Sequence, residues 1–480
     1  MDRYRNKGKG VSEQMASKEK SIVSMTDMTQ GNPYKLILMF SIPLLVGNIF
    51  QQLYNMVDSI VVGNFVGDKA LAAVGTGFPI IFLMSSLFMG IGTGATVMVS
   101  QFYGARDLKR VNDTINTIYT AMIIGVVPLT ILGVLLSEPL LRLIRVPDDG
   151  TLEMAKIYMI VILIGIIGNL GFNINSGILQ GLGDSRTSLI FLLIAAIINT
   201  VLDLVFVIVF HWGVMGVALA TIIAQVFSWV FGVWFINRRY CEIHIKLLGF
   251  HFDKALFKQA MKLGVPSGIQ QALFSVGVLV MQSLVNSYGS AFMAGFNGAN
   301  KIDTFAFMPI QSFTNAVTTY AGQNIGAGNH ERVRKGLQAG MILSVGTSIL
   351  MCLLVYPTSA FMMRMFSQNQ EVINAGVAYL HELMPFYALL AISFCFNSVM
   401  RGAGEMIVPM ISTLFALWLV RVPTAYLLAH FFGGEMMYYS YAIGWVVGIL
   451  VSGGYYATGR WKNKSVVKKM DLQETASQSD

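Results

Sequence analysis

Charged residues are scarce in this chain, at 12% of its 480 residues, whereas a typical soluble domain carries about 25%. Cysteine is nearly absent too: the three cysteines have no metal-ligand spacing, so we expect neither disulfides nor a zinc site. No GxxxxGKS/T loop occurs, and the Gly90-Ile-Gly92-Thr-Gly94 cluster follows no strand pattern, which argues against nucleotide binding. We therefore expect neither a soluble enzyme nor a bound cofactor.

Hydrophobic residues make up 55% of the sequence instead, and they occur in long runs. A membrane-spanning helix needs about 20 predominantly apolar residues. Stretches of that length lie at 36–65, 70–101, 114–137, 153–180, 187–210, 214–236, 257–288, 292–323, 336–357, 373–400, 406–431 and 437–459. The pattern predicts an all-α integral membrane protein with twelve transmembrane helices, embedded in membrane lipid.

Lysine and arginine are distributed unevenly between the segments that join these runs. With the N-terminus inside, 26 of the 33 basic residues fall on the inner side and 5 on the outer side, while Lys301 and Arg421 lie within spans. This bias predicts that both termini are cytoplasmic, in a multi-pass protein of the bacterial plasma membrane. The net charge of +8 is spread over many short segments, so we expect no nucleic-acid partner.

Three pairs of motifs recur at an offset of 221–223 residues, which indicates a duplicated chain. The pairs are Ile42-Pro43 with Val265-Pro266, Gln101–Ala105 with Gln323–Ala327, and Gln180–Asp184 with Arg401–Glu405. Each half contains six spans, so both have the same orientation and substrate should bind between them near the midplane. We predict two pseudo-symmetric six-helix bundles with the following segments: a polar tail (1–32), an N-lobe (33–236), a cytoplasmic linker (237–256), a C-lobe (257–460) and a second tail (461–480).

Acidic residues within spans are informative, because each costs at least ~2.5–3.5 kcal/mol on insertion scales. Asp58 and Asp203 fall at the same depth as Thr221, about 12–15 Å below the outer surface at 1.5 Å per residue. Asn199 lies four residues before Asp203 and shares its helix face. We predict that Asp58, Asn199, Asp203 and Thr221 form a cation-coupling site.

These four side chains offer hard oxygen atoms, which would be the metal ligands if the coupling ion is Na⁺. Crowding of two carboxyl groups in a low dielectric favours a bound proton instead, so H⁺ is the other candidate. The alternative is that Asp58 and Asp203 only hydrogen-bond helices together.

Further polar residues mark a candidate substrate cavity. Gln51, Tyr54 and Asn55 form a polar stripe with Asp58 on the first span, and Asp303 is a third deep acid. Lys301 lies two residues from Asp303, so Asp303 has either a structural ion pair or a role in transport. The 29 methionines and 31 phenylalanines suit a pocket that accepts varied hydrophobic cations.

The chain resembles the multidrug and toxic compound extrusion (MATE) family over residues 33–460. The resemblance is carried by Ile42-Pro43, the Gln52–Asp58 segment with Gly63, Gln101–Arg106, Gln180–Asp184 and their second-half counterparts. It implies two six-helix bundles that alternate between inward-open and outward-open states. It also implies an N-lobe cation site made by the residues that match Asp58, Asn199, Asp203 and Thr221. Some relatives carry a glutamate in the seventh span, but no acid follows Pro266 there, so we do not expect a C-lobe cation site of that type.

We therefore expect a monomeric secondary active exporter of small lipophilic or cationic drugs, of the kind that confers antibiotic resistance. It would be driven by Na⁺ or H⁺, and the residues leave the choice of ion open because the same oxygen atoms can serve both. The alternative function is that of a flippase for a lipid-linked substrate with the same two-lobe architecture.

Overall fold

The computed structural model describes residues 26–247 and 249–471. Much of the two predicted polar tails, at 1–25 and 472–480, lies outside the described residues. Over the described ranges the chain is helical and contains no β-strand. Most of the helices are long, and their order follows the order of the predicted spans.

The first half of the chain forms six helical segments. They are α2 (Pro33–Val61) with the π-helix η1 (Val62–Val66), α3 (Asp68–Gly104), α4 (Leu108–Leu143), the pair α5 (Thr151–Ile164) and α6 (Ile166–Gly181), α7 (Ser185–Leu204) with the π-helix η2 (Val205–Val209), and α8 (Gly213–Arg239). The pair α5–α6 is bent by 52°, although we predicted one continuous span over 153–180. The bend falls at Gly165, whose Cα packs so closely against Ile222 that a Cβ there would lie 2.2 Å from that side chain.

The second half forms six more segments. They are α9 (Lys254–Asn286), α10 (Ser290–Gly326), α11 (His330–Arg364), α12 (Gln370–Leu383) joined by η3 (Met384–Phe386) to α13 (Tyr387–Gly402), α14 (Ile407–Leu414) with η4 (Phe415–Arg421) and α15 (Val422–Phe432), and α16 (Tyr439–Ala457) preceded by η5 (Gly434–Tyr438). A last short helix, η6, spans Arg460–Asn463. Ten segments of the described chain are long and apolar enough to cross a membrane, the bent α5–α6 pair adds an eleventh, and α10, with 37 residues, stands at the remaining predicted position.

Matching side chains begin equivalent helices in the two halves. The Asp107 side chain accepts a hydrogen bond from the backbone N–H of Arg110 at the start of α4, at 3.0 Å. Asn329, at the repeat offset, accepts one from the backbone N–H of Arg332 at the start of α11, at 3.1 Å. Each bond satisfies a donor that has no partner within its helix, so the duplicated sequence sets equivalent helix starts.

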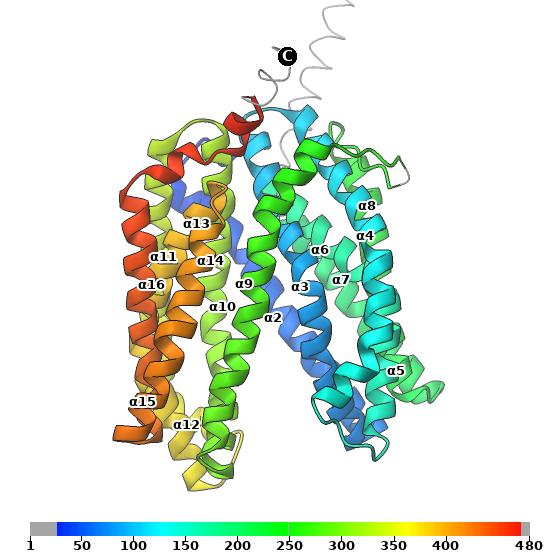
Figure 1. The fold of residues 1–480 in the computed structure, drawn as a ribbon, viewed down its shortest axis with the longest axis vertical. Helices are drawn as coiled ribbons and strands as arrows, with labels where there is room; N and C mark the ends of the chain where they lie inside the picture. The colour runs from blue at the N-terminus through cyan, green and yellow to red at the C-terminus, as the bar shows by residue number, and fades with distance from the viewer. Residues whose placement is uncertain (1–25, 248, 472–480) are drawn as a thin grey trace, which may run out of the picture.

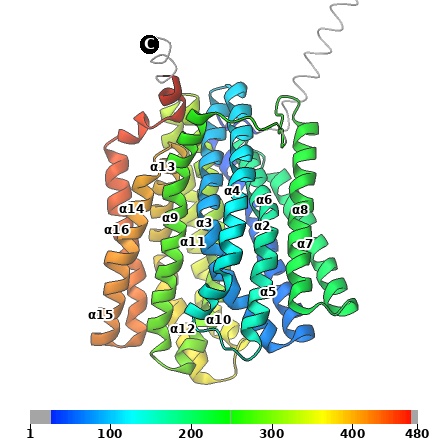
Figure 2. The same cartoon turned by 45° about the vertical axis from the view of Figure 1, so that its right-hand side comes forward.

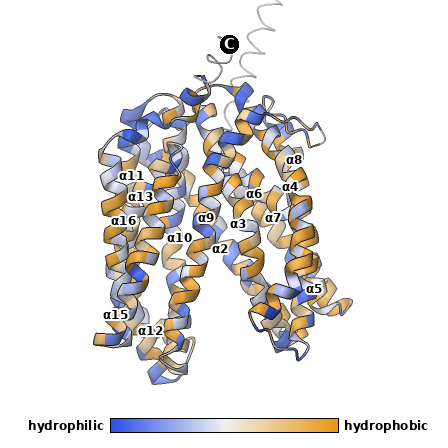
Figure 3. Cartoon of the chain, viewed as in Figure 1, coloured by the Kyte–Doolittle hydropathy of each residue, from blue (hydrophilic) through white to orange (hydrophobic). Residues whose placement is uncertain are grey.

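The helices form two groups that converge at one end of the molecule and diverge toward the other (Figure 1). We call the converging end, which holds the described residues 26–31 and 460–471, the terminal end, and the opposite end the far end. Hydrophobic residues cover the helices between these ends, and hydrophilic residues gather toward both (Figure 3). This banded distribution is the one that a bilayer requires of a helical membrane protein.

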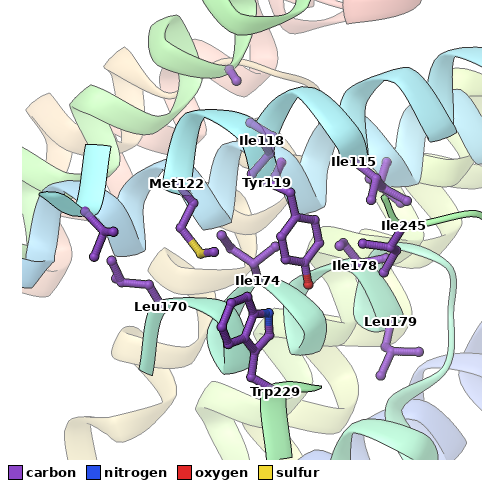
Figure 4. Packing of buried hydrophobic residues seen from close by; sticks show 14 of the residues in the cluster. Ile115, Ile118, Tyr119, Met122, Leu170, Ile174, Ile178, Leu179, Trp229 and Ile245 are labelled. Atoms are coloured by element: carbon purple, nitrogen blue, oxygen red, sulfur yellow. The ribbon is translucent and has the colours of Figure 1, made fainter. Parts of the chain in front are cut away.

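Each group has its own packed interior. In the first, Tyr119 and Ile174 lie against Trp229, and all three side chains are at most 8% exposed (Figure 4). In the second, Tyr379, Tyr387 and Tyr438 are buried in an equivalent cluster. Near the terminal end, one helix from each half of the chain packs against the other half. Ile37 of α2 lies in a hydrophobic cluster of the second half, and Leu256 of α9 lies in the cluster of the first half.

Close packing of α3 against α9 joins the two groups, and these helices lie side by side in both ribbon views (Figures 1 and 2). A Cβ on Gly90 would lie 2.3 Å from the backbone oxygen of Gly264, and one on Gly94 would lie 2.9 Å from that of Ala260. The glycine cluster of the second span therefore serves helix contact, since only glycine lets two backbones approach this closely.

Two glutamines of the repeated motifs close the terminal end reciprocally. Gln101 of α3 donates from Nε2 to the Gly402 oxygen at 2.7 Å, and its Oε1 accepts from the Val466 N–H at 2.7 Å. Gln323 of α10 donates to the Gly181 oxygen at 3.1 Å, and its Oε1 accepts from the Met28 N–H at 2.9 Å. Each glutamine thus ties its own half to the other half and to one of the two terminal segments.

Candidate cation-coupling site

The four residues predicted to bind a cation meet in the first group of helices, in its half toward the far end. Asp58 comes from the end of α2, Asn199 and Asp203 from the end of α7, and Thr221 from α8. The Asn199 Nδ2 donates to Thr221 Oγ1 at 3.3 Å. The carboxyl groups of Asp58 and Asp203 lie close enough to interact with each other. The structure therefore brings together residues that are up to 163 positions apart in the sequence.

Two tyrosines complete the surroundings of the acid pair. The Tyr54 hydroxyl lies near Thr221 and Asp58. Tyr158 of α5 lies close enough to both carboxyl groups to interact with their charges. The sequence pointed to Tyr54 through its place in the polar stripe, but nothing in the pattern around Tyr158 singled it out, because its neighbours Ile157 and Met159 are apolar.

Several buried oxygen atoms of this cluster have no hydrogen-bond donor within the described part of the chain. They are Asp58 Oδ1, Asn199 Oδ1, and both Oδ1 and Oδ2 of Asp203. The Asn199 amide is oriented by Thr221, which takes its N–H and leaves the Asn199 oxygen free to accept. No salt bridge found within residues 26–247 and 249–471 involves Asp58 or Asp203. The cluster thus presents acceptors without a matching positive charge.

The backbone is irregular immediately after both acids. The π-helix η1 begins four residues after Asp58, and η2 begins two residues after Asp203. A π-helical turn widens the helix and often occurs at functional sites. Neither turn could be predicted from its residues, since both segments consist mainly of valine, phenylalanine and isoleucine.

A polar cavity of about 180 Å³ adjoins the acid pair and reaches toward the terminal end. Gln51 and Tyr54 line it as predicted, and so does Asn199, which faces the cavity and the acid pair alike. Asn55 is exposed and is not among the lining residues, so the polar stripe only partly faces the cavity. Asn173 and Gln225 line the same space, although the sequence analysis did not identify them.

Asp303 lies apart from these residues, in the second group of helices. It lines a cavity of about 290 Å³, and its Oδ2 accepts a hydrogen bond from the Tyr379 hydroxyl at 3.1 Å. Lys301 is exposed, and the salt bridges of the described chain do not join it to Asp303. The predicted substrate-cavity residues are therefore divided between two cavities, because α2 and α10 belong mainly to different bundles.

Comparison with known proteins matches this chain to one family twice. The sequence pattern that defines the MatE family matches residues 43–205 and again residues 266–427. These two matches confirm the duplication that the repeated motifs predicted.

Curated relatives cover nearly the whole chain. The chain is 30% identical over 438 residues to "Probable multidrug resistance protein YpnP" of Bacillus subtilis, covering 91% of this chain and 97% of that protein. It is 25% identical to "Probable multidrug resistance protein NorM" of Thermotoga maritima, covering 92% and 96%. "Multidrug export protein MepA" of Staphylococcus aureus is 22% identical over 78% of this chain and 82% of its own length.

Solved structures share the fold. A structure described as "Outward-facing conformation of a multidrug resistance MATE family transporter of the MOP superfamily" superimposes with a TM-score of 0.84 at 25% identity, covering 91% of this chain and 98% of the other. A crystal structure of MATE in complex with MaL6 matches equally well, with a TM-score of 0.84 over 91% and 98% of the two chains. The predicted all-α membrane fold of twelve helices in two bundles is confirmed by this likeness.

Proposed function

Because this chain belongs to the MatE family of multidrug efflux transporters, we propose that it exports lipophilic or cationic compounds in exchange for Na⁺ or H⁺. The exchange would proceed by alternating access between the two bundles, with both termini in the cytoplasm of a bacterial cell and the monomer as the working unit. The asymmetric distribution of lysine and arginine supports this orientation. The terminal end is then the cytoplasmic face.

The observation that carries the proposal is the group of buried, unpartnered oxygen atoms around Asp58 and Asp203. Two carboxyl groups in contact inside a membrane are costly as anions, since each loses its hydration and repels the other. One bound Na⁺ or one shared proton removes that cost. The site is therefore built to change its occupancy, which a purely structural pair of hydrogen-bonded aspartates would not need.

Either ion can be accommodated by the atoms present. For Na⁺, the oxygens of Asp58, Asn199, Asp203 and Thr221 supply hard ligands of the type that alkali ions accept. For H⁺, one aspartate would carry the proton and donate a hydrogen bond to its neighbour, since the two groups lie close together. Tyr54 supports both cases, because its hydroxyl can donate to the remaining carboxylate.

Exchange follows from the position of the polar cavity beside the acid pair. Tyr54 and Asn199 belong to both the ion site and the cavity, so an ion and a compound bound there contact the same side chains. A cationic compound and a bound cation also compete for the same negative charge. Binding of one weakens binding of the other, and this reciprocal coupling is what antiport requires.

The conformation fits an outward-open state. The bundles are tied together at the proposed cytoplasmic face by Gln101 and Gln323, and they diverge toward the far end (Figure 1). Alternating access then requires these ties to break and the far end to close. An ion that neutralises Asp58 and Asp203 lowers the cost of burying them when the far end closes.

Ethidium efflux from proteoliposomes under a sodium gradient and, separately, under a pH gradient tests the proposal. We expect one gradient to drive efflux, and we expect Asp58→Asn and Asp203→Asn to abolish it while the protein remains folded by thermal unfolding. Asp149→Asn is the matched control, because Asp149 is an exposed aspartate in the loop between α4 and α5. Undiminished efflux in both N-lobe variants would refute the coupling site.

A flippase for a lipid-linked substrate is the alternative, and it would need a cationic cavity between the bundles to hold a phosphate. The polar cavity beside the acid pair is lined by neutral side chains such as Gln51, Asn173 and Gln225. Transfer of a fluorescent lipid between leaflets, in the absence of drug efflux, would favour this alternative.

A further inference from the structure

The second bundle encloses a cavity that differs in charge from the one beside the acid pair. This C-lobe cavity, of about 290 Å³, lies between α9, α10, α12, α13, the π-helix η4 and α16. Phe274, Phe296, Phe307 and Trp445 are among its walls, so most of its lining is aromatic or aliphatic. Pockets of about this size and composition bind small organic molecules and orient them with a few polar groups.

Arg421 supplies a permanent positive charge to this cavity. It is the last residue of η4, and its Cζ atom lies 3.2 Å from the centre of the Tyr441 ring, so the guanidinium is stacked and held in place. Its Nε–H is buried and has no acceptor within residues 26–247 and 249–471. A buried guanidinium N–H with no acceptor costs free energy, so the protein itself compensates the charge of Arg421 incompletely.

Asp303 supplies the opposite charge. Tyr379 occupies one of its oxygens, while Oδ1 is buried and lacks a donor among the described residues. The charge of Arg421 acts on Asp303, yet none of the salt bridges of the described chain joins the two side chains. Asp303 and Arg421 therefore line the same cavity with opposite charges and are not joined by an ion pair.

The adjoining space repeats the same feature. A second cavity, of about 300 Å³, shares Phe274, Phe307 and Asn397 with the first and extends to Arg401. Arg401 donates from one terminal nitrogen to Gln270 Oε1 at 3.1 Å, but its Nε is buried without an acceptor in the described part of the chain. Among the described residues that line these two cavities, two guanidinium groups and one carboxyl group, that of Asp303, thus have a hydrogen-bonding atom without a partner.

The duplicated sequence shows how the two lobes diverged. The repeat offset of 221–223 residues places the counterpart of Asn199 at 420–422, a range that contains Arg421. The same offset places the counterpart of Asp58 at 279–281, which reads Leu-Val-Met. At the positions that match Asp58 and Asn199 of the N-lobe, the C-lobe therefore has no acid and carries the fixed charge of Arg421 instead.

From this geometry we propose that the C-lobe cavity is a binding site for aromatic compounds that carry both a carboxylate and a basic nitrogen. The carboxylate would bind the guanidinium of Arg421, and the basic nitrogen would bind Asp303, with the aromatic body between the phenylalanine and tryptophan walls. A compound that carries only a positive charge is repelled by Arg421 and binds more weakly. That such compounds are also exported rests on the proposed function, whereas their binding does not.

A pair of dyes that differ in one group tests the proposal. Rhodamine 110 has a free carboxyl group and two amino groups, and rhodamine 123 is its methyl ester, a net cation. Fluorescence anisotropy with the purified protein in detergent, without an ion gradient, gives the two dissociation constants. We expect rhodamine 110 to bind about tenfold more tightly, the difference expected for one charge-assisted hydrogen bond.

Variants assign that preference to the two charges. Arg421→Gln should weaken rhodamine 110 by about tenfold and leave rhodamine 123 no weaker, and Arg421→Lys should restore part of the preference. Asp303→Asn should weaken both dyes, because both carry amino groups. Arg364→Gln is the matched control, since Arg364 is an exposed arginine at the end of α11.

Equal affinity of the wild-type protein for the two dyes would overturn the proposal, and this comparison requires no variant to fold. Unchanged binding of rhodamine 110 by folded Arg421→Gln would overturn it as well. Asp203→Asn separates the two hypotheses: it should abolish ion-driven efflux and retain rhodamine 110 binding. Efflux that survives Asp203→Asn refutes the coupling site and leaves the C-lobe site standing.

Discussion

The reciprocal closure by Gln101 and Gln323 leads to a prediction about the balance between conformations. In the present state Gln101 makes three buried hydrogen bonds, to Gly402 at 2.7 Å, from Val466 at 2.7 Å and from Ser465 at 3.3 Å. When the terminal end opens, the same groups can bond to water. Gln101→Ala therefore destabilises the closed face more than the open one.

The size of the effect follows from the number of bonds. A buried hydrogen bond contributes about 1 kcal/mol net, so the loss of the Gln101 side chain should shift the equilibrium by about 2–3 kcal/mol. Since about 1.4 kcal/mol corresponds to a factor of ten, the open fraction relative to the closed one rises by about 30- to 150-fold. Gln323→Ala, which removes one bond to Gly181 and one from Met28, should give a shift of about 2 kcal/mol.

Spin labels on opposite bundles measure this shift. Lys109 at the start of α4 and Arg334 in the first turns of α11 are both exposed at the terminal end and can be replaced by labelled cysteines. Electron double resonance should show a longer distance gaining population in Gln101→Ala. Gln368→Ala, in an exposed loop after α11, is the control. A distance distribution identical to that of the control would refute the reasoning that these glutamines hold the face closed.

Three further predictions concern single contacts. Gly104→Ala places a Cβ 1.9 Å from the Gln323 backbone oxygen, so it should push the bundles apart and lengthen the same spin-label distance. Burial acts to raise the pKa of Glu405, but the hydrogen bond and charge of Lys464, at 2.6 Å, outweigh it and hold this pKa below its ordinary value of 4.5. Glu405→Gln should therefore lower the melting temperature by a constant amount above about pH 4.5, and the difference should vanish as the pH falls through the lowered pKa; a pH-independent difference would contradict this. Tyr54→Phe removes a hydroxyl from the proposed ion site and should raise the ion concentration for half-maximal efflux by up to about tenfold, with the maximal rate unchanged.

Much of the architecture could be predicted from the sequence, because a bilayer imposes strict requirements on a chain. Long apolar runs, the sidedness of lysine and arginine, and motif pairs at a constant offset predict twelve helices in two halves without reference to tertiary contacts. The convergence of Asp58, Asn199, Asp203 and Thr221 was accessible as well. Depth along a helix can be counted from the sequence, and buried acids are too costly to be incidental.

Other features depend on contacts between segments that are distant in the sequence. The bend at Gly165 depends on the close packing of this glycine against α8. The π-helical turns after the two acids have no residue pattern that distinguishes them from an ordinary apolar helix. Arg401 counted as a cytoplasmic topology charge in the sequence, yet its side chain turns inward to Gln270. For a residue at a helix end, a hydropathy pattern cannot tell whether the side chain points into the bundle or away from it. The direction depends on which neighbouring helix offers a hydrogen-bond acceptor.

The glutamine motifs show the division most clearly. Their repetition was evident from the sequence, and so was the asymmetry of the acids between the two halves. That Gln101 and Gln323 bond reciprocally across the bundles, and that Arg421 faces Asp303 across a cavity without an ion pair, was decided only by the tertiary structure. The sequence specifies which polar groups must be satisfied inside the membrane, and the packing of the two halves determines which partner satisfies each one, or leaves it available for a ligand.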